Sequence, residues 1–72
     1  MPLTFANPGE KYTLLKIKGK EEEKNFLTGL GFTEGVDIDV VSRLDKSLIV
    51  NVRGARVALG TDMAKKLMVS GS

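Results

Sequence analysis

Short turn sequences divide this chain of 72 residues into segments that leave no room for a long helix or a long strand. Most of the turns contain a glycine, because they need backbone conformations that other residues resist. A fold built from such segments consists of short elements joined by tight turns. The expected turns lie at residues 7–10, 19, 31, 33–35, 44–47 and 54.

The first segment, residues 11–18, alternates in polarity with the period of two that is typical of a strand. We expect Thr13, Leu15 and Ile17 to point toward the core. The side chains expected on the opposite, outward face are those of Tyr12, Leu14, Lys16 and Lys18.

Residues 20–30 predict a short helix. Residues 21–23 are all glutamates, and negative charge in the first turn is favoured by the helix dipole. Phe26, Leu27 and Leu30 share one side of this helix, which we expect to cover the core. Gly29 in the last turn predicts a close packing neighbour there, and Gly31 predicts the helix end.

After residue 35 the pattern returns to a period of two and predicts three more strands, over residues 36–40, 48–52 and 56–59. The side chains expected to face inward in the first two are Val36, Ile38, Val40, Leu48, Val50 and Val52. Asp37 and Asp39 then share the outer face.

The last residues predict a short helical turn followed by a closing strand. Thr61 is a suitable N-cap for that turn, and Met63 and Leu67 are spaced to face the core. Val69 is expected in the closing strand, and residues 70–72 are expected to fray.

Together these elements predict one mainly β domain over residues 1–72. The expected architecture is a small, strongly bent antiparallel sheet or barrel with one inserted α-helix and a short C-terminal helical turn. The composition, 42% hydrophobic and 28% charged, is ordinary for a folded domain. The chain has no cysteine, so this fold must be stable without disulfides.

Several function classes lack the residues they need. The chain contains no histidine and no cysteine, the most common catalytic base and the thiolate metal ligand. It also lacks the glycine-rich phosphate loop of nucleotide hydrolases, and no spacing suggests a nucleophile beside a base. We therefore expect no enzymatic activity. No signal peptide or membrane span is recognisable, which makes the cytoplasm the expected compartment.

The charged residues suggest two kinds of ligand, a divalent metal and the phosphates of a nucleic acid. Asp37 and Asp39 are the candidates for a divalent metal such as Fe²⁺, although two exposed carboxylates on a strand more often serve solvation alone. Lys16 and Lys18 could contact phosphates, but residues 21–23 are acidic and the net charge is only +2. We therefore expect no nucleic-acid partner and no resident cofactor.

Surplus apolar side chains give the better indication of function. Leu14, Val41 and Ile49 fall on the outward side of the predicted strands, and Leu30 and Phe32 flank the glycine at the helix end. Either the helix and the C-terminal turn cover these residues, or they form a contact patch for another protein. Few aromatic residues are present, which argues against a groove for proline-rich peptides.

The turns also resemble those of a known family. The sequence from Leu30 to Val36, LGFTEGV, resembles the L-G-[LF]-x-x-G-x signature of the FeoA family, the ferrous iron transport protein A domain. Residues 49–59, IVNVRGARVAL, are similar to its V-x-V-R-G-x-R-[ILV]-A-L segment. The opening with Pro8-Gly9-Glu10 and the closing residues 62–69 also agree, so the resemblance covers nearly the whole chain.

This resemblance implies an SH3-like barrel and a cytosolic accessory protein of bacterial ferrous iron uptake. Such a protein would dock to the cytoplasmic GTPase portion of the FeoB-type permease and modulate it, without chemistry of its own. An alternative is a divalent-metal-binding regulatory domain, related to the C-terminal domain of diphtheria-toxin-repressor-type regulators. The expected partner-binding residues are Leu14, Leu30, Phe32, Ile49, Arg53 and Arg56.

Overall fold

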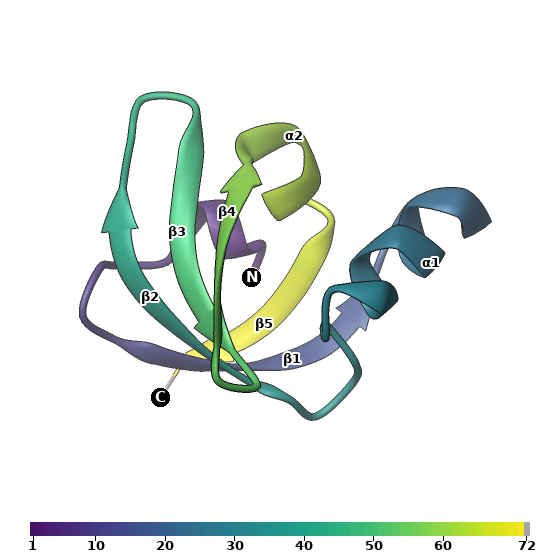
Figure 1. Cartoon of the computed structure of the whole chain (residues 1–72), viewed down its shortest axis with the longest axis horizontal. Helices are drawn as coiled ribbons and strands as arrows, with labels where there is room; N and C mark the ends of the chain where they lie inside the picture. Colours follow the sequence, from purple (N-terminus) through teal and green to yellow (C-terminus); the bar gives the residue numbers. More distant parts are fainter. Residues whose placement is uncertain (72) are drawn as a thin grey trace.

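The computed structural model describes residues 1–71 and contains one antiparallel sheet of five strands in the order β4-β3-β2-β1-β5 (Figure 1). The strands are β1 Lys11–Ile17, β2 Asp37–Arg43, β3 Ser47–Val52, β4 Ala55–Gly60 and β5 Leu67–Gly71. The helices are the 3₁₀-helix η1 Leu3–Phe5 and the α-helices α1 Glu21–Gly29 and α2 Thr61–Ala64. Within residues 1–71, none of the helices has the length and apolar character needed to cross a membrane.

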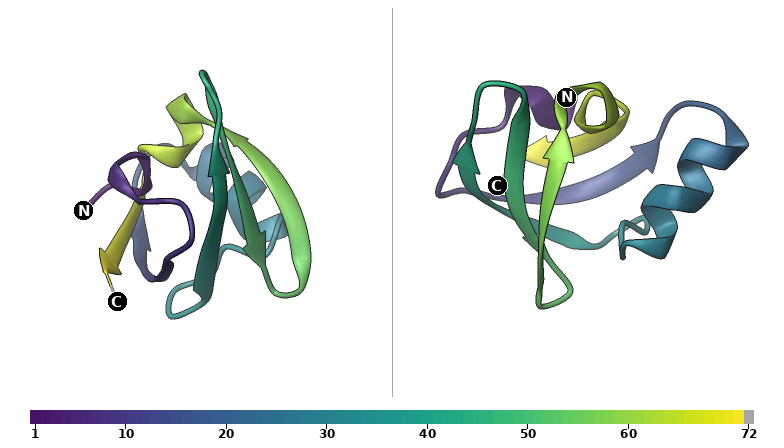
Figure 2. Two further views of the ribbon diagram at one scale, coloured as in Figure 1. Left: turned by 90° about the vertical axis from the view of Figure 1, so that its left-hand side faces the viewer. Right: turned by 45° about the horizontal axis from the view of Figure 1, so that its top comes forward.

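The sheet curls around a single core, with α2 linking its two outer strands and α1 standing at one end (Figure 2). Register shifts in β1, between Leu14 and Lys16, and in β2, between Val40 and Ser42, help to bend it. This confirms the predicted mainly β, SH3-like architecture with one inserted helix and a short C-terminal helical turn.

The predicted inward and outward faces of β1 are wrong in its first half. Tyr12 and Leu14 are buried, whereas Leu15 is 53% exposed. The β-bulge between Leu14 and Lys16 is the reason, because it shifts the alternation by one residue and returns Ile17 to the core side. An unbroken alternation counted from Ile17 therefore assigns the earlier residues to the wrong face.

Helix α1 forms as predicted but packs through a narrower face. Leu27 is fully buried and Leu30 is half-buried, while Phe26 is 56% exposed and does not cover the core as expected. A Cβ added at Gly29 would meet no other atom within 4 Å, so the predicted close contact there is also wrong. Gly31 ends the helix with φ +108, which confirms its predicted role.

Strands β2 and β3 supply much of the core, as predicted. Ile38 and Val40 of β2 are buried, and every second residue of β3 faces inward. Phe32, which follows the helix, is fully buried with them. The buried apolar residues are Leu3, Ala6, Tyr12, Leu14, Leu27, Phe32, Ile38, Val40, Leu48, Val50, Val52, Leu59, Ala64, Leu67 and Val69.

The C-terminal segment differs from the prediction at two points. Helix α2 begins at Thr61 itself, and its N-cap is Gly60, so Thr61 is not the cap. Ser70 and Gly71 do not fray, because they pair with β1 as part of β5. Residue 72 lies outside the described residues. Met63 and Leu67 do contact the core as predicted.

One carboxylate ties α1 to the rest of the fold. Glu23 Oε1 accepts a hydrogen bond from the Lys20 backbone N–H at 2.9 Å and forms an ion pair with Lys66 Nζ at 3.2 Å. The first contact caps the helix start, and the second reaches the connection between α2 and β5. The capping hydrogen bond and the Lys66 ammonium lower the pKa of Glu23.

The two neighbouring leucines of β1 provide a direct test of the bulge. We expect Leu14→Ala to lower the free energy of unfolding by about 2–5 kcal/mol, because it opens a cavity in the core. Leu15→Ala should change it by no more than about 0.5 kcal/mol, because that side chain already faces solvent. Urea unfolding followed by circular dichroism measures both, and equal losses would contradict the observed faces.

The Glu23 contacts predict a stability that depends on pH. A lowered pKa in the folded state means that the stabilisation is present above the usual glutamate range, about pH 4.3, and is lost as the pH falls through the folded value. Thermal unfolding at pH 7 should show Glu23→Gln less stable than the parent, and the difference should shrink toward pH 3. Glu22→Gln, which changes another glutamate in the same turn, is the matched control.

Candidate interaction surface

The predicted contact residues separate into buried and accessible ones. Leu14 and Phe32 are almost completely buried, so they belong to the core and cannot meet a partner on the surface. For Leu14 the cause is the bulge in β1. Phe32 turns inward because the chain reverses at Gly31 after the helix ends. Leu30 and Ile49 are partly exposed, and Arg53 and Arg56 are exposed.

Arg53 joins the β3–β4 hairpin to the end of α1. A Cβ on Gly31 would lie 3.4 Å from Arg53 Cδ, so the arginine stem passes along the side of that glycine where a side chain would begin. At its tip, Nη2 donates a long hydrogen bond of 3.5 Å to Thr33 Oγ1. The hairpin and the helix end, far apart in sequence, therefore form one continuous surface.

The backbone of Arg53 is in an unfavourable conformation. Arg53 and Gly54 form the two-residue loop of the hairpin, and both have positive φ, +50 and +79, as a type I′ turn requires. Glycine and asparagine are the usual residues in such turns, and a left-handed conformation costs a long side chain about 1 kcal/mol. An arginine here is held in an orientation that the turn alone does not favour.

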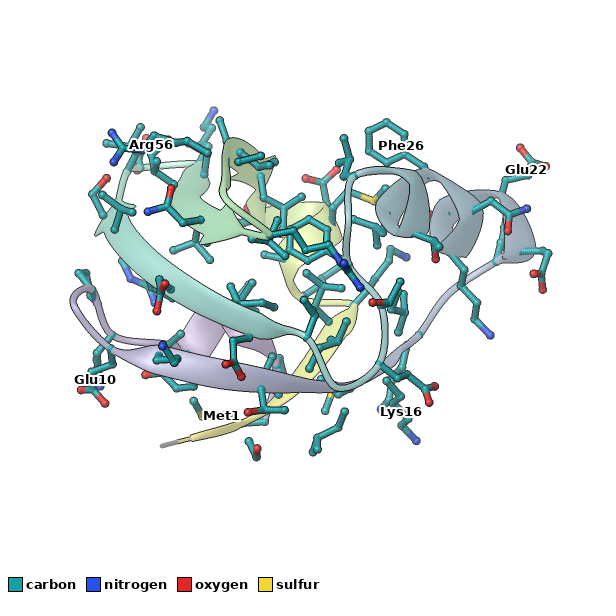
Figure 3. The ribbon with its side chains drawn as sticks, turned by 60° about the horizontal axis from the view of Figure 1, so that its bottom comes forward. Met1, Glu10, Lys16, Glu22, Phe26 and Arg56 are labelled. Carbon is teal, nitrogen blue, oxygen red and sulfur yellow. The ribbon has the colours of Figure 1, made fainter. Side chains whose placement is uncertain are left out.

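Arg56 and Ile49 lie on the outer face of the sheet, on the side away from the core. Arg56 is paired with Asn51, and its Nε donates to Asn51 Oδ1 at 3.4 Å. Figure 3 shows Arg56 projecting from the sheet at the end of the molecule away from α1. Ile49 is paired with Ala58, so a small apolar area adjoins the arginine.

Neither arginine is neutralised within the part of the chain that the structure describes. There the one ion pair joins Lys66 and Glu23, and neither arginine takes part in it. The guanidinium groups of Arg53 and Arg56 therefore keep most of their donors free for an external acceptor. Carboxylates and phosphates are the acceptors that match their geometry.

An open groove of about 300 Å³ lies beside this surface, between α1 and the loop that follows it. Ile17 and Phe32 are its apolar members. Its polar members are Glu21, Lys24, Asn25, Thr28, Thr33 and Glu34. Thr33 also receives the Arg53 hydrogen bond, so the groove adjoins the arginine. The groove was not predicted from the sequence, although the spacing of the four helix residues over 21–28 places them on one face.

Two exposed apolar side chains were not predicted either. Phe26 projects from α1 away from the sheet (Figure 3), and Leu15 stands at the bulge of β1. Periodicity alone places both in the core. Their exposure is the direct consequence of the narrower helix face and of the bulge.

Asp37 and Asp39 lie on the outer face of β2 and are exposed, as expected. Thr13 Oγ1 donates to Asp37 Oδ1 at 3.4 Å, and Lys11 is the cross-strand neighbour of Asp39. Divalent cations such as Ca²⁺ take six or more oxygen ligands. Residues 1–71 contain no group of three or more acidic side chains that could hold a metal. The two-aspartate metal site stays a prediction, and the observed neighbours do not favour it.

Comparison with solved structures shows that other proteins share this fold. A crystal structure of Stenotrophomonas maltophilia FeoA with zinc, described as a procaryotic SH3 domain protein, superimposes with a TM-score of 0.85 at 22% identity, over 97% of this chain and 89% of the other. A manganese-dependent transcriptional repressor in complex with manganese superimposes with a TM-score of 0.93 at 20% identity. That match covers all of this chain and 36% of the repressor. At these identities the likeness shows the fold alone.

Two closer matches and a family model concern the sequence. A relative from Methanocaldococcus jannaschii, named Fe(2+) transport protein A, is 29% identical over 68 residues, which cover 94% of this chain and 83% of the relative. A crystal structure of an iron uptake regulatory protein (FeoA) is 31% identical with a TM-score of 0.91, over 99% of this chain and 95% of the other. The model of the FeoA domain matches residues 1–71, and the chain therefore belongs to the FeoA family.

Proposed function

We propose that this protein is a cytosolic accessory protein of ferrous iron uptake, which docks to the cytoplasmic GTPase portion of a FeoB-type permease and modulates it. Membership of the FeoA family over residues 1–71 carries the proposal. The similar proteins named for Fe(2+) transport and for iron uptake regulation support the same process. In this role the nucleotide and the iron pathway belong to the permease.

The surface at the hairpin loop and the helix end is the proposed contact region. Arg53 supplies a guanidinium group whose stem passes beside Gly31 and whose tip donates to Thr33, and these neighbours restrict the side chain before a partner binds. Leu30, half-buried beside it, supplies apolar area. Arginine is one of the residues enriched in the energetically dominant part of protein interfaces.

The action of such a protein is a shift in the populations of the permease, not a chemical step. A ligand that binds one conformation of its partner better than another changes their ratio by its differential affinity. For this purpose the domain needs only a defined contact surface. Ferrous iron would be the cargo of the permease, and this role requires no metal on the accessory protein.

Titration of the ¹⁵N-labelled protein with the GTPase portion of its own organism's permease tests this proposal. We expect amide shifts at residues 30–34 and 53–54. Arg53→Gln should weaken binding about tenfold, because it removes a charge-assisted contact. Lys65→Gln, which removes one exposed positive charge after α2, beyond the opposite end of β4 from this loop, should leave the affinity nearly unchanged. An unshifted spectrum at large partner excess would exclude docking to this portion.

Arg53→Asn separates the binding role from the structural one. Asparagine fits a type I′ turn better than arginine does, so we expect the free energy of unfolding to stay equal or to rise by about 1 kcal/mol. Binding to the same permease portion should nevertheless weaken, as for Arg53→Gln. Urea unfolding and isothermal titration calorimetry give the two values. A variant that is both less stable and unchanged in binding would assign Arg53 to the fold alone.

A further inference from the structure

The two edges of the sheet, β5 and β4, differ in whether another part of the chain covers them. The β5 edge is covered by the first residues of the chain: the Met1 amino group donates to Val69 O at 2.8 Å, and Val69 N–H donates to Met1 O at 2.7 Å. Pro2 forms a bridge to Met68 beside this pair. An added strand cannot reach β5 there without displacing these residues.

The β4 edge has no such cover in the described part of the chain. Its pairing with β3 runs without interruption from Ala55 to Gly60, whereas β1 and β2 each contain a register shift. Strand edges are commonly protected by proline, by charged side chains, by bulges or by a covering segment, and of these β4 has only the charge of Arg56. Figure 2 shows β4 as the outer strand on its side of the molecule.

The hairpin geometry fixes which backbone groups of β4 face this open edge. In a two-residue hairpin the closing pair, Val52 and Ala55, is a hydrogen-bonded pair, and hydrogen-bonded and non-bonded pairs then alternate. Val57 therefore directs its N–H and C=O toward β3, while Arg56 and Ala58 direct theirs away from the sheet. Both of these residues are exposed. Within residues 1–71 no loop, turn or helix backbone group bonds to the outward N–H and C=O groups of Arg56 and Ala58.

The charge of this edge indicates what kind of strand would add to it. Arg56 stands on the strand and Arg53 lies in its loop, whereas Lys46 and Asp62, of opposite charge, both lie near its far end beside Gly60. Strand β4 itself carries no acidic residue. A second copy paired on this edge would add a second set of the same positive charges beside the first, whereas opposite charges across paired strands are stabilising. An acidic strand would instead bring carboxylates toward two guanidinium groups that form no ion pair within residues 1–71.

We propose that the β4 edge binds an extended, acidic segment of the permease's cytoplasmic portion as a sixth strand, through the backbone of Arg56 and Ala58 and the guanidinium groups of Arg53 and Arg56. This mode takes its affinity from main-chain hydrogen bonds and its specificity from alternate side chains. The proposal rests on the proposed function, and it adds the chemistry of the bound segment and the atoms that hold it.

Amide hydrogen exchange in the complex with the permease's GTPase portion provides the sharpest test. The amides of Arg56 and Ala58 face solvent in the free protein, and we expect their exchange to slow about tenfold or more when a strand pairs with them. The Val57 amide lies between them but is already bonded to β3, so its exchange should change far less. This alternation distinguishes strand addition from simple burial of the region.

Two variants support the exchange measurement. Arg56→Gln should weaken binding about fivefold to tenfold and reduce its salt dependence, because it removes a charge contact. Lys16→Gln removes the same charge far from Arg56 (Figure 3) and should have little effect. Ala58→Pro removes one edge N–H without breaking the β3 pairing and should abolish binding. If that variant fails to fold, the exchange pattern and the affinity of Arg56→Gln still test whether a strand adds to β4.

The outcomes separate this inference from the function on which it rests. Slowed exchange at Arg56 and Ala58 but not at Val57, together with weaker binding of Arg56→Gln, supports both the strand addition and the docking function. Binding without slowed exchange at Arg56 and Ala58, or with the three residues slowed equally, overturns the strand addition and leaves the docking function intact. No binding at all overturns both. A protein that dimerises with the same protection when the permease portion is absent would assign the edge to a second copy.

Discussion

The burial of one face of β1 is the constraint on which the rest of the structure depends. This strand pairs with β2 on one side and β5 on the other, so it joins the two halves of the sheet. Tyr12 and Leu14 fill the core from its first half, and the bulge after Leu14 lets Ile17 do so from its end. Tyr12 can be buried because its hydroxyl accepts a hydrogen bond from Asn7 N–H at 2.8 Å. The bulge also bends the sheet, which allows a small chain without disulfides to enclose its core.

At the end of α1, the chain reversal that the core requires also brings the helix end beside the β3–β4 hairpin loop. The chain must reverse after Leu30, and Gly31 provides the left-handed conformation that this reversal needs. The stem of Arg53 from the distant hairpin passes beside this glycine, 3.4 Å from the position that a Cβ would take. The arginine adopts an unfavourable backbone conformation, and its contacts with Gly31 and Thr33 are modest compensation. Residues held in such conformations concentrate at functional sites, which agrees with the contact role proposed for Arg53.

The proposed function and the proposed strand addition use one end of the same hairpin. Its loop carries Arg53 against the helix end, and its outer strand presents the free backbone groups of Arg56 and Ala58. A single extended partner segment can therefore contact the charge of Arg53 and the open edge of β4 together. The contrast with β5, whose edge is covered by Met1 and Pro2, indicates that the fold leaves one edge available and protects the other.

Local sequence was enough to predict the five strands, the two α-helices and the family, although it did not predict η1. Glycine positions located the turns, the glutamates of residues 21–23 located the helix start, and alternation in residues 48–52 assigned the buried face correctly. The exposure of individual side chains, in contrast, depends on the closed sheet: Leu14 and Phe32 were predicted on the surface and are buried, while Leu15 and Phe26 were predicted inside and are exposed. The contact between Arg53 and Gly31 likewise exists only in the folded chain. The physical reason is that periodicity records local geometry alone, whereas a bulge, a helix's orientation and a contact between distant segments depend on how the whole sheet closes around its core.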